Sequence, residues 1–356
     1  MTGAEALDYD LPDAAIAQVP AEPRDSARLL VDCGPSQPPD HRTVADLPSL
    51  VGPGDLVVVN DTRVIPARLH LHKPSGGAVE VLLLERTGRR RWEALVRPGR
   101  RVPPGTVVEG THLRVQVGEV LGDGRRAVVL HFHGQIDEID AIEDHGEVPL
   151  PPYIHEPLAD PERYQTTFAE QSDLTHQVPA DGDHLRSVAA PTAGLHLTPE
   201  VLERCREAGA RVTEVRLAVG LGTFRPITVD DVEEHQMHGE RYVVPLDVLA
   251  ECETAERVLA IGTTVVRALE SAALALDRGE PADGRTELFI HGDFEFRVVD
   301  RLLTNFHVPR SSLLALIDAF VGPRWRRLYE TALAERYRFL SFGDAMLLDR
   351  GWGRAA

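Results

Sequence analysis

The sequence has few cysteines and no long apolar run. Its three cysteines, Cys33, Cys205 and Cys252, are odd in number and far apart. They indicate neither a disulfide framework nor a metal site, and they fit a reducing cytoplasm. No uncharged apolar stretch is long enough to span a bilayer, and the start, MTGAEALDYDLPD, lacks the basic-then-apolar order of a signal peptide. We therefore expect a cytoplasmic protein with no membrane partner.

Lysine is almost absent, because Lys73 is the only one and arginine supplies the remaining positive charge. The formal net charge is −18. That charge disfavours nonspecific binding to nucleic acid or to an anionic membrane, although it allows a local basic groove. Arginines cluster in residues 86–92, 97–101 and 323–338. Each cluster is typical of a solvated face, and a phosphate-contacting patch is the second interpretation of the first two.

Chain length and strand spacing predict two domains. The chain has 356 residues, which is more than one small core needs. Short β-type runs between Gly and Pro turns fill residues 65–150 and predict a small antiparallel β-barrel. Strands alternate with helices in residues 1–64 and 151–356. We therefore expect a larger mixed α/β domain into which the barrel is inserted.

Four loops share one design, in which an apolar strand ends, small or polar residues follow, and a helix begins. They contain VAAPTAGLH (188–196), VGLGTFRP (219–226), IGTTVVRALE (261–270) and LTNFHVPRSSLL (303–314). After the first, Thr198 is expected to cap a helix that starts at Pro199. If the strands run parallel, the clusters meet at one sheet edge, where α/β proteins bind ligands. Each loop alone fits an ordinary cap and turn, whereas four together favour a polar pocket that accepts anions.

Two further motifs carry titratable side chains. EEHQMHGE (233–240) places His235 and His238 three residues apart, so on a helix both imidazoles would share a face and could bind one metal ion. No third His or Cys stands at a supporting spacing, so we predict no metal and favour acid–base or hydrogen-bonding roles. A surface helix with two unengaged histidines stays open as the alternative. SFGDAML places Asp344 as either a β-turn acid or an acceptor for a ligand.

Motifs in order along nearly the whole chain resemble the S-adenosylmethionine:tRNA ribosyltransferase-isomerase family of queuosine biosynthesis. They include GDLVVVNDTRVIPARL, WEALVRPGRRVPPGT, GEVPLPPYI, SVAAPTAGLHLT, VGLGTFRPI, HQMHGE, IGTTVVRALES, VVDRLLTNFHVPRSSLL and YRFLSFGDAML. The resemblance implies a catalytic α/β domain with an inserted β-barrel. It also implies transfer and isomerisation of the ribosyl unit of S-adenosylmethionine onto 7-aminomethyl-7-deazaguanine in the tRNA anticodon loop. The product is epoxyqueuosine-tRNA, adenine and methionine are released, and we expect the enzyme to act as a monomer without a metal.

The implied reaction defines the groups that the site must supply. A base removes a C5′ hydrogen, a donor protonates the departing adenine, and an arginine or a helix N-terminus holds the methionine carboxylate. The expected catalytic residues are His196, His238, His307 and Asp344, with His196 or His238 as the base. The expected substrate-binding residues are Asn60, Asp61, Thr62, Arg63, Thr192, Gly194, Gly222, Thr223, Arg225, His235, Glu240, Thr263, Thr264, Arg267, Glu270, Asn305, Arg310 and Ser311. Arg267 and Arg310 are the candidates for the carboxylate.

The sequence departs from the family motifs in ways that keep two alternatives open. Ala218 stands where the family usually has His, Gly239 stands where it usually has Ser, and the segment 170–186 is longer than usual. One alternative is an enzyme that acts on a free deazapurine base or nucleoside in secondary metabolism. The other is a non-catalytic relative that binds nucleic acid or nucleoside. Adenine release with tRNA, with a small acceptor only, or with neither distinguishes the three hypotheses.

Overall fold

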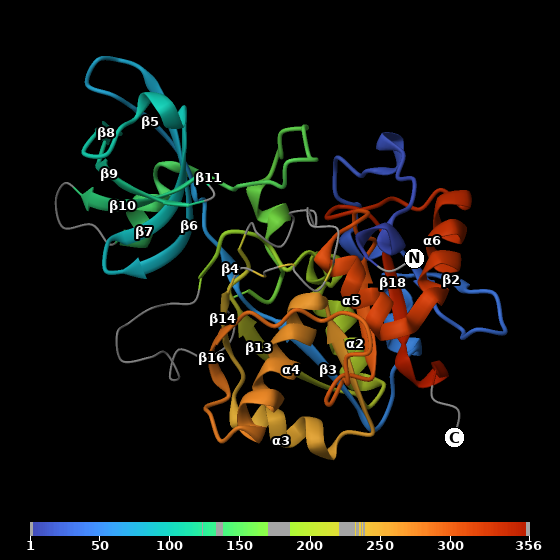
Figure 1. Cartoon of the computed structure of the whole chain (residues 1–356). Helices are drawn as coiled ribbons and strands as arrows, with labels where there is room; N and C mark the ends of the chain where they lie inside the picture. The colour runs from blue at the N-terminus through green and yellow to red at the C-terminus, as the bar shows by residue number, and fades with distance from the viewer. Residues whose placement is uncertain are drawn as a thin grey trace. The chain divides into compact units, whose positions relative to one another are not determined.

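The chain divides into two compact units. The computed structural model describes residues 3–122, 124–132, 138–169, 186–220, 232, 235, 237 and 239–353. The first unit comprises Met1–Arg63, Pro152–Leu185 and Ala190–Ala356, and the second comprises Val64–Pro151 and Arg186–Ala189. Figure 1 shows the chain coloured from the N-terminus to the C-terminus. The limits expected for the two domains, 1–64 with 151–356 and 65–150, stay a prediction, because compactness alone does not show that either unit folds independently.

The first unit is built on a nine-stranded mixed sheet. In sheet order its strands are β16 (Asp283–Thr286), β14 (Glu240–Val243), β13 (Arg211–Leu217), β3 (Asp55–Asn60), β15 (Arg257–Ile261), β17 (Arg301–Asn305), β18 (Ala345–Asp349), β1 (Arg28–Val31) and β2 (Asp40–Thr43). Strands β13, β3, β15 and β17 run parallel to one another. Strand β18 is antiparallel to β17 and parallel to β1. The carboxyl ends of four parallel strands therefore lie at the same edge.

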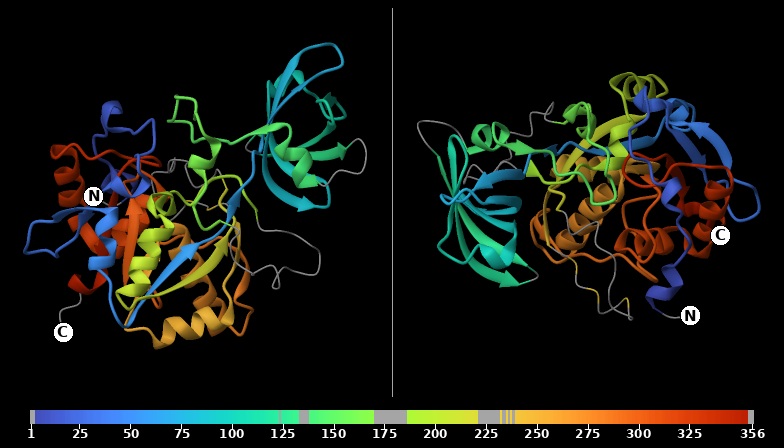
Figure 2. Two further views of the ribbon diagram at one scale, coloured as in Figure 1. Left: turned by 180° about the vertical axis from the view of Figure 1, so that it is seen from behind. Right: turned by 90° about the horizontal axis from the view of Figure 1, so that it is seen from above.

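Helices cover both faces of this sheet, which explains the apolar run DLVVVN of β3, buried along its whole length. The α-helices of the first unit are α2 (Pro199–Glu207), α3 (Leu246–Thr254), α4 (Thr263–Asp277), α5 (Ser312–Val321) and α6 (Trp325–Ala334). Val201, Leu202 and Cys205 of α2 pack with Val57 and Val59 in one core. Helix α4 lies on the opposite face (Figures 1 and 2). None of the helices in the described ranges is both long and apolar enough to cross a membrane.

Local signals start these helices where the sequence predicts. The hydroxyl of Thr198 accepts a hydrogen bond from the Val201 amide, and Pro199 is the first residue of α2, so the predicted cap is confirmed. Ser311 caps α5 in the same way through the Leu314 amide. Helix α4 follows Gly262, whose φ of +96° favours glycine.

The second unit contains a closed barrel of six antiparallel strands. Around the ring they are β5 (Arg68–His72), β6 (Ala78–Gly88), β7 (Arg91–Arg97), β10 (Arg125–Phe132), β9 (Leu113–Gly122) and β8 (Val107–Glu109), which pairs back with β5. Strand β11 (Gly146–Glu147) extends β5, α1 spans Glu138–Glu143, and β4 (Arg63–Val64) pairs with β12 (Arg186–Ser187). In β9 buried and exposed side chains alternate from Leu113 to Val117, as a strand around a filled barrel requires. The predicted α/β class with a small antiparallel barrel is confirmed.

Short 3-10 helices connect the main elements. They are η1 (Ala4–Leu7), η2 (Asp13–Ala15), η3 (Arg24–Ser26), η4 (Val44–Ser49), η5 (Gly99–Arg101), η6 (Pro161–Tyr164), η8 (Thr192–His196), η11 (Gly322–Arg324) and η12 (Arg350–Gly353). Two of them carry residues of functional interest. The η8 turn carries two of the expected site residues, and η5 carries two exposed arginines.

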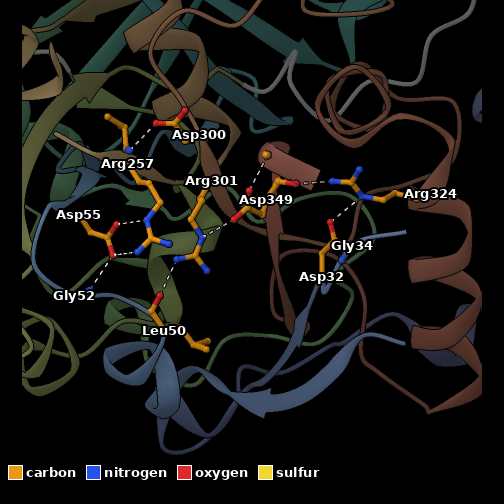
Figure 3. Close-up of polar contacts among 12 residues, drawn as sticks. Asp32, Gly34, Leu50, Gly52, Asp55, Arg257, Asp300, Arg301, Arg324 and Asp349 are labelled. Carbon is orange, nitrogen blue, oxygen red and sulfur yellow. Dashed lines mark hydrogen bonds and ion pairs between the residues drawn. The ribbon is translucent and has the colours of Figure 1, made fainter. Parts of the chain in front are cut away.

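Ion pairs hold the amino ends of the parallel strands, as Figure 3 shows. Buried Asp55 at the start of β3 accepts hydrogen bonds of 2.7 and 2.9 Å from Arg257 at the start of β15. Arg301 at the start of β17 donates to the Leu50 carbonyl at 2.7 Å and lies 3.5 Å from Asp349. This edge is therefore occupied by interactions within the protein, which leaves the carboxyl edge for binding.

Candidate active site

Three of the four predicted loops reach the carboxyl edge of the parallel strands, whereas residues 221–226 of the remaining loop lie outside the described residues. Strands β3 and β17 end in Asn60 and Asn305, and β15 ends just before Gly262. The loop that holds η8 follows β12, outside the large sheet, yet it reaches the same edge. A Cβ built on Gly262 would lie 3.4 Å from the Cβ of Ala193 in η8. The condition that the strands before these loops run parallel holds for β13, β15 and β17, whereas the first loop follows β12 and reaches the edge by a different route.

A small cavity of about 30 Å³ lies at this edge, which is room for about one or two waters. Thr192, Asn305 and His307 line it together with Tyr153, Phe306, Val308, Leu313, Leu340 and Ser341. The Thr192 hydroxyl donates to Oδ1 of Asn305 at 3.0 Å. The Asn305 amide donates to Nε2 of His196 and to the Leu340 carbonyl, both at 3.1 Å. Residues from η8, from β17 and from the loop after α6 therefore form one hydrogen-bonded cluster.

His196 in this cluster and His307 beside the cavity are both neutral at pH 7. His196 is 4% exposed and His307 is 7% exposed. Burial lowers the pKa of His196 to about 4 and that of His307 to about 3. Because Nε2 of His196 accepts from the Asn305 amide, the ring proton is assigned to Nδ1. The His307 ring pairs with the Thr304 hydroxyl at 3.1 Å.

Asn60 organises the neighbouring part of the edge. Its amide donates to the Leu217 carbonyl at 3.0 Å and contacts the Thr264 hydroxyl at 3.4 Å. Its Oδ1 accepts from the backbone amides of Leu217 and Thr62 at 3.1 and 3.2 Å. Thr62, Thr263 and Thr264 are buried. Asn60 therefore ties the ends of β3 and β13 to the first turn of α4.

Two buried ion pairs flank this network. Asp61 accepts two hydrogen bonds from Arg216, at 3.0 and 2.6 Å. Arg267 of α4 pairs with Glu240, whose second oxygen accepts from the Gly220 amide at 3.0 Å. Nε of Arg267 donates to the Leu288 carbonyl at 3.2 Å, whereas its buried Nη2 has no hydrogen-bond partner among the described residues. A buried guanidinium nitrogen in this state is suited to an anionic ligand group.

Four expected site residues make structural contacts away from the cavity. Asp344 accepts from the backbone amides of Arg28 and Arg338 at 3.1 and 2.8 Å, and it also pairs with the Arg338 guanidinium. Buried Glu270 accepts from three consecutive amides, 297–299, at 2.9 to 3.1 Å, and burial raises its pKa. Arg310 pairs with Asp8 at 2.9 Å where both side chains are exposed, and Ser311 caps α5. Thr192 and His307 share the cavity, whereas Arg267 and Asp344 do not line it.

The remaining expected residues lie around the same elements or outside the described parts. A Cβ on Gly194 would lie 3.0 Å from Phe168 and Thr166, so the glycine serves close packing. Arg63 lies 4.0 Å from Glu162. The His235 ring contacts Phe289 edge-on, with 5.2 Å between centroids. Gly222, Thr223, Arg225 and His238 lie outside the described residues, as does most of the segment 170–186.

Two residues of the cavity, Tyr153 and Ser341, are not predicted from the sequence. The Tyr153 hydroxyl bonds the Ser341 hydroxyl at 2.7 Å, and burial raises the pKa of Tyr153 to about 12, so the phenol stays protonated. Tyr153 stands in PLPPYI and Ser341 three residues before Asp344, both inside motifs already noted. No spacing rule shows that positions 188 residues apart meet. The described residues contain no group of three or more His, Cys, Asp or Glu that could hold a metal ion.

Comparison with known proteins assigns the family. A family model described as "Queuosine biosynthesis protein" matches residues 4–348. The chain belongs to this queuosine biosynthesis family. A relative from Rubrobacter xylanophilus, named S-adenosylmethionine:tRNA ribosyltransferase-isomerase, is 49% identical over 352 residues, with 98% of each chain covered. A relative of the same name from Symbiobacterium thermophilum is 45% identical, with 96% of this chain and 98% of the relative covered. The predicted family resemblance is confirmed.

A solved structure in the queuosine biosynthesis family supports the fold. The crystal structure of S-adenosylmethionine tRNA ribosyltransferase from Thermotoga maritima matches with a TM-score of 0.51 at 35% identity and covers 96% of this chain and 99% of that one.

Gly239, one of the departures from the family motifs, has a local explanation. A Cβ on it would lie 2.3 Å from Nε of Arg285, so a serine there requires the Arg285 side chain to move.

Proposed function

We propose that this member of the queuosine biosynthesis family is a transferase that uses S-adenosylmethionine as its ribosyl donor. It transfers and isomerises the ribosyl moiety onto 7-aminomethyl-7-deazaguanine in tRNA, giving epoxyqueuosine-tRNA and releasing adenine and methionine. The observation that carries the proposal is the identity of 45–49% to two relatives of that name over at least 96% of this chain. The presence of three of the four expected loops at one sheet edge supports it.

Arg267 is the proposed anchor for the methionine carboxylate. Its Nη2 is buried without a partner among the described residues, while its other nitrogens hold Glu240 and the Leu288 carbonyl. Its position is therefore fixed before a ligand arrives, which reduces the entropic cost of binding. The other candidate, Arg310, has a side chain 46% exposed that pairs with Asp8. The structure therefore favours Arg267 over Arg310 for this role.

The uncharged polar groups of the edge suit the adenosine part of the substrate. Thr192, Thr264, Asn60 and Asn305 present hydroxyls and amides that can bond ribose hydroxyls and a neutral base. The charges nearby are already compensated, because Asp61 pairs with Arg216 and Glu240 with Arg267. Each of these two arginines is thus balanced by a carboxylate. A cationic sulfonium nucleoside can therefore bind nearby without strong charge repulsion.

Proton transfer requires a base with a free lone pair, and His196 or His238 is proposed for it. His196 is neutral at pH 7, as a base must be, but its Nε2 already accepts from Asn305. Substrate must therefore displace this amide before Nε2 can accept a proton. His307 is also neutral and lines the cavity. Asp344 is proposed to position the chain around Arg338 rather than to touch substrate.

The test is incubation with S-adenosylmethionine and a tRNA that carries the deazaguanine precursor, followed by measurement of adenine and of the mass of the modified base. We expect stoichiometric adenine and epoxyqueuosine. We expect His196→Ala to lose turnover and still bind S-adenosylmethionine, while His155→Ala, at an exposed histidine, serves as the matched control. Release of adenine only with a free deazapurine acceptor would support the secondary-metabolism alternative. No release with any acceptor would support a binding-only relative.

The partner and the assembly state complete the proposal. We propose that a single chain acts on the anticodon loop of tRNA in the cytoplasm. Light scattering of the enzyme with and without tRNA would check the assembly. A complex with the mass of one chain and one tRNA is expected, and a stable dimer would contradict it.

A further inference from the structure

Two groups of basic side chains in the second unit form no ion pair with any described residue: Arg89 and Arg91 at the start of β7, and a group of four near its other end. The arginine ion pairs of this unit join Arg68 to Glu80, Arg86 to Glu138, Arg114 to Glu109 and Arg125 to Glu93, at 2.7 to 3.4 Å. Lys73, Arg97, Arg100 and Arg101 form no ion pair with any described residue. All three of these arginines are exposed. Their charges are thus available to a partner.

These four residues come from two adjoining connections of the barrel. Lys73 lies in the turn between β5 and β6, Arg97 ends β7, and Arg100 and Arg101 belong to η5. The Lys73 ammonium donates a hydrogen bond to the Arg101 carbonyl, which joins the turn to η5. We refer to Lys73, Arg97, Arg100 and Arg101 as the basic corner.

The backbone of the basic corner is held from inside the barrel. Val102, next to Arg101, is fully buried, and its carbonyl accepts from Arg126 at 3.1 Å. Arg126 is only 6% exposed and also donates twice to the Gly118 carbonyl, at 3.3 and 3.0 Å. The buried Arg126 side chain therefore holds the C-terminal end of η5 through the Val102 carbonyl. The exposed guanidinium groups therefore project from an ordered segment, which favours binding to a partner.

The charge balance of the chain indicates the kind of partner. Residues 64–151 hold twelve Lys and Arg and twelve Asp and Glu, a balance of zero, so the rest of the chain carries the full −18. An extended anionic surface such as a membrane would be repelled by that excess. A narrow polyanion can reach a local cluster of positive charge. One guanidinium group can donate two parallel hydrogen bonds to the oxygens of one phosphate. A nucleic acid backbone is therefore the partner that fits these arginines best.

We propose that the basic corner binds the phosphate backbone of RNA. The inference rests on the proposed function, in which the substrate is a tRNA. Contacts to the phosphate backbone do not involve the reacting base, so they contribute equally to binding the substrate and the transition state. Their loss should therefore raise KM for tRNA and leave kcat at saturating tRNA unchanged.

The test compares two double variants with the same change of charge. Arg100→Gln/Arg101→Gln removes two charges of the basic corner, and Arg89→Gln/Arg91→Gln removes two exposed arginines at the other end of β7. Affinity for tRNA carrying the precursor is measured by fluorescence anisotropy at several KCl concentrations. We expect the first variant to lose about tenfold in affinity and to flatten the salt slope by about 2, since each phosphate contact contributes about 1 to it. The control should stay within about twofold of the wild type.

The outcomes separate this inference from the proposed function. Equal weakening by both variants, or unchanged affinity in Arg100→Gln/Arg101→Gln, would overturn the basic corner even while the enzyme releases adenine with tRNA. A wild-type protein that binds no tRNA at any salt concentration would overturn both proposals. Binding to phosphatidylserine vesicles is measured as well, to test a membrane as the alternative partner. Vesicle binding that only the Arg100→Gln/Arg101→Gln variant loses, with tRNA affinity unchanged, would assign the corner to a membrane instead. Thermal melts by circular dichroism check that both variants fold.

Discussion

The Asn305 amide donates a hydrogen bond of 3.1 Å to Nε2 of His196, and so ties the end of β17 to the η8 turn. The same Asn305 accepts from the Thr192 hydroxyl at 3.0 Å. One side chain therefore sets both the tautomer of the imidazole and the direction of the hydroxyl. This relationship makes Asn305 the central residue of the cluster.

Replacement of Asn305 by Asp should raise the pKa of His196 from its value of about 4. A carboxylate next to the ring favours the protonated imidazole, and it can accept a hydrogen bond from Nε2–H. The imidazole protons of His196 would be followed by NMR as a function of pH. Asn305→Gln is the uncharged control. A titration midpoint that does not move in Asn305→Asp would show that the two side chains do not interact in solution.

Stability should fall as the pH drops from about 6.5 towards 4, because the two buried imidazoles resist protonation. Burial holds the folded pKa of His196 at about 4 and that of His307 at about 3, below the value near 6.5 of an unfolded histidine. Above pH 6.5 both states are neutral, so the contribution is fully present there. Below 6.5 the unfolded chain takes up protons first, and the free energy of unfolding falls by about 1.4 kcal/mol per pH unit for each proton.

Urea unfolding between pH 7 and pH 4.5 measures this slope. The variant His307→Gln should show a shallower slope than the wild type, because one of the two protons no longer binds to the unfolded chain. His155→Gln, at an exposed position, should keep the wild-type slope. Identical slopes in all three proteins would contradict the assignment of neutral buried imidazoles.

Replacement of Arg267 by Lys should raise KM for S-adenosylmethionine by about tenfold, with a smaller effect on kcat. Lysine retains a charge for Glu240, but a single ammonium cannot also present a second nitrogen to a carboxylate. Arg310→Lys is the matched control at an exposed arginine and should leave KM unchanged. Steady-state adenine release provides both constants. The same KM in wild type and Arg267→Lys would exclude Arg267 as the carboxylate anchor.

The ion pair at the opposite edge of the sheet should matter for stability alone. Asp55→Asn weakens both bonds from Arg257 and should lower the free energy of unfolding by about 1–3 kcal/mol, because Asp55 is only 2% exposed. Asp40→Asn, in a solvated pair with Arg42, is the control. Chemical denaturation measures the difference. A loss of adenine release by folded Asp55→Asn at a temperature well below its melting point would show that this edge also takes part in catalysis.

Much of the architecture follows from patterns within single segments. The buried run of β3, the cap at Thr198 and the close-spaced strands of the barrel each depend on neighbours in the sequence, so the sequence predicts them. The loop design also predicts that Thr264 and Asn305 lie at one sheet edge, because they follow β15 and end β17, which run parallel. These features are local, or they follow from the right-handed connections of parallel strands.

The parts that escape prediction depend on distant partners. Asp344 and Glu270 have the residue type of catalytic acids, yet each binds backbone amides that only the folded chain brings near. Tyr153 and Ser341 line the cavity through a contact across 188 residues. The path of the chain from β12 to η8 at this sheet edge is likewise not predictable from the sequence. Residue type indicates what a side chain can do, whereas its partners decide which of those roles it performs.

The most direct test of the central claim is a crystal structure of the protein with S-adenosylmethionine bound. The account predicts the nucleoside at the carboxyl edge of β3, β15 and β17, with its methionine carboxylate on Arg267 and polar contacts to Thr192 or Asn305. A ligand bound elsewhere, with none of these side chains within hydrogen-bond distance, would contradict it.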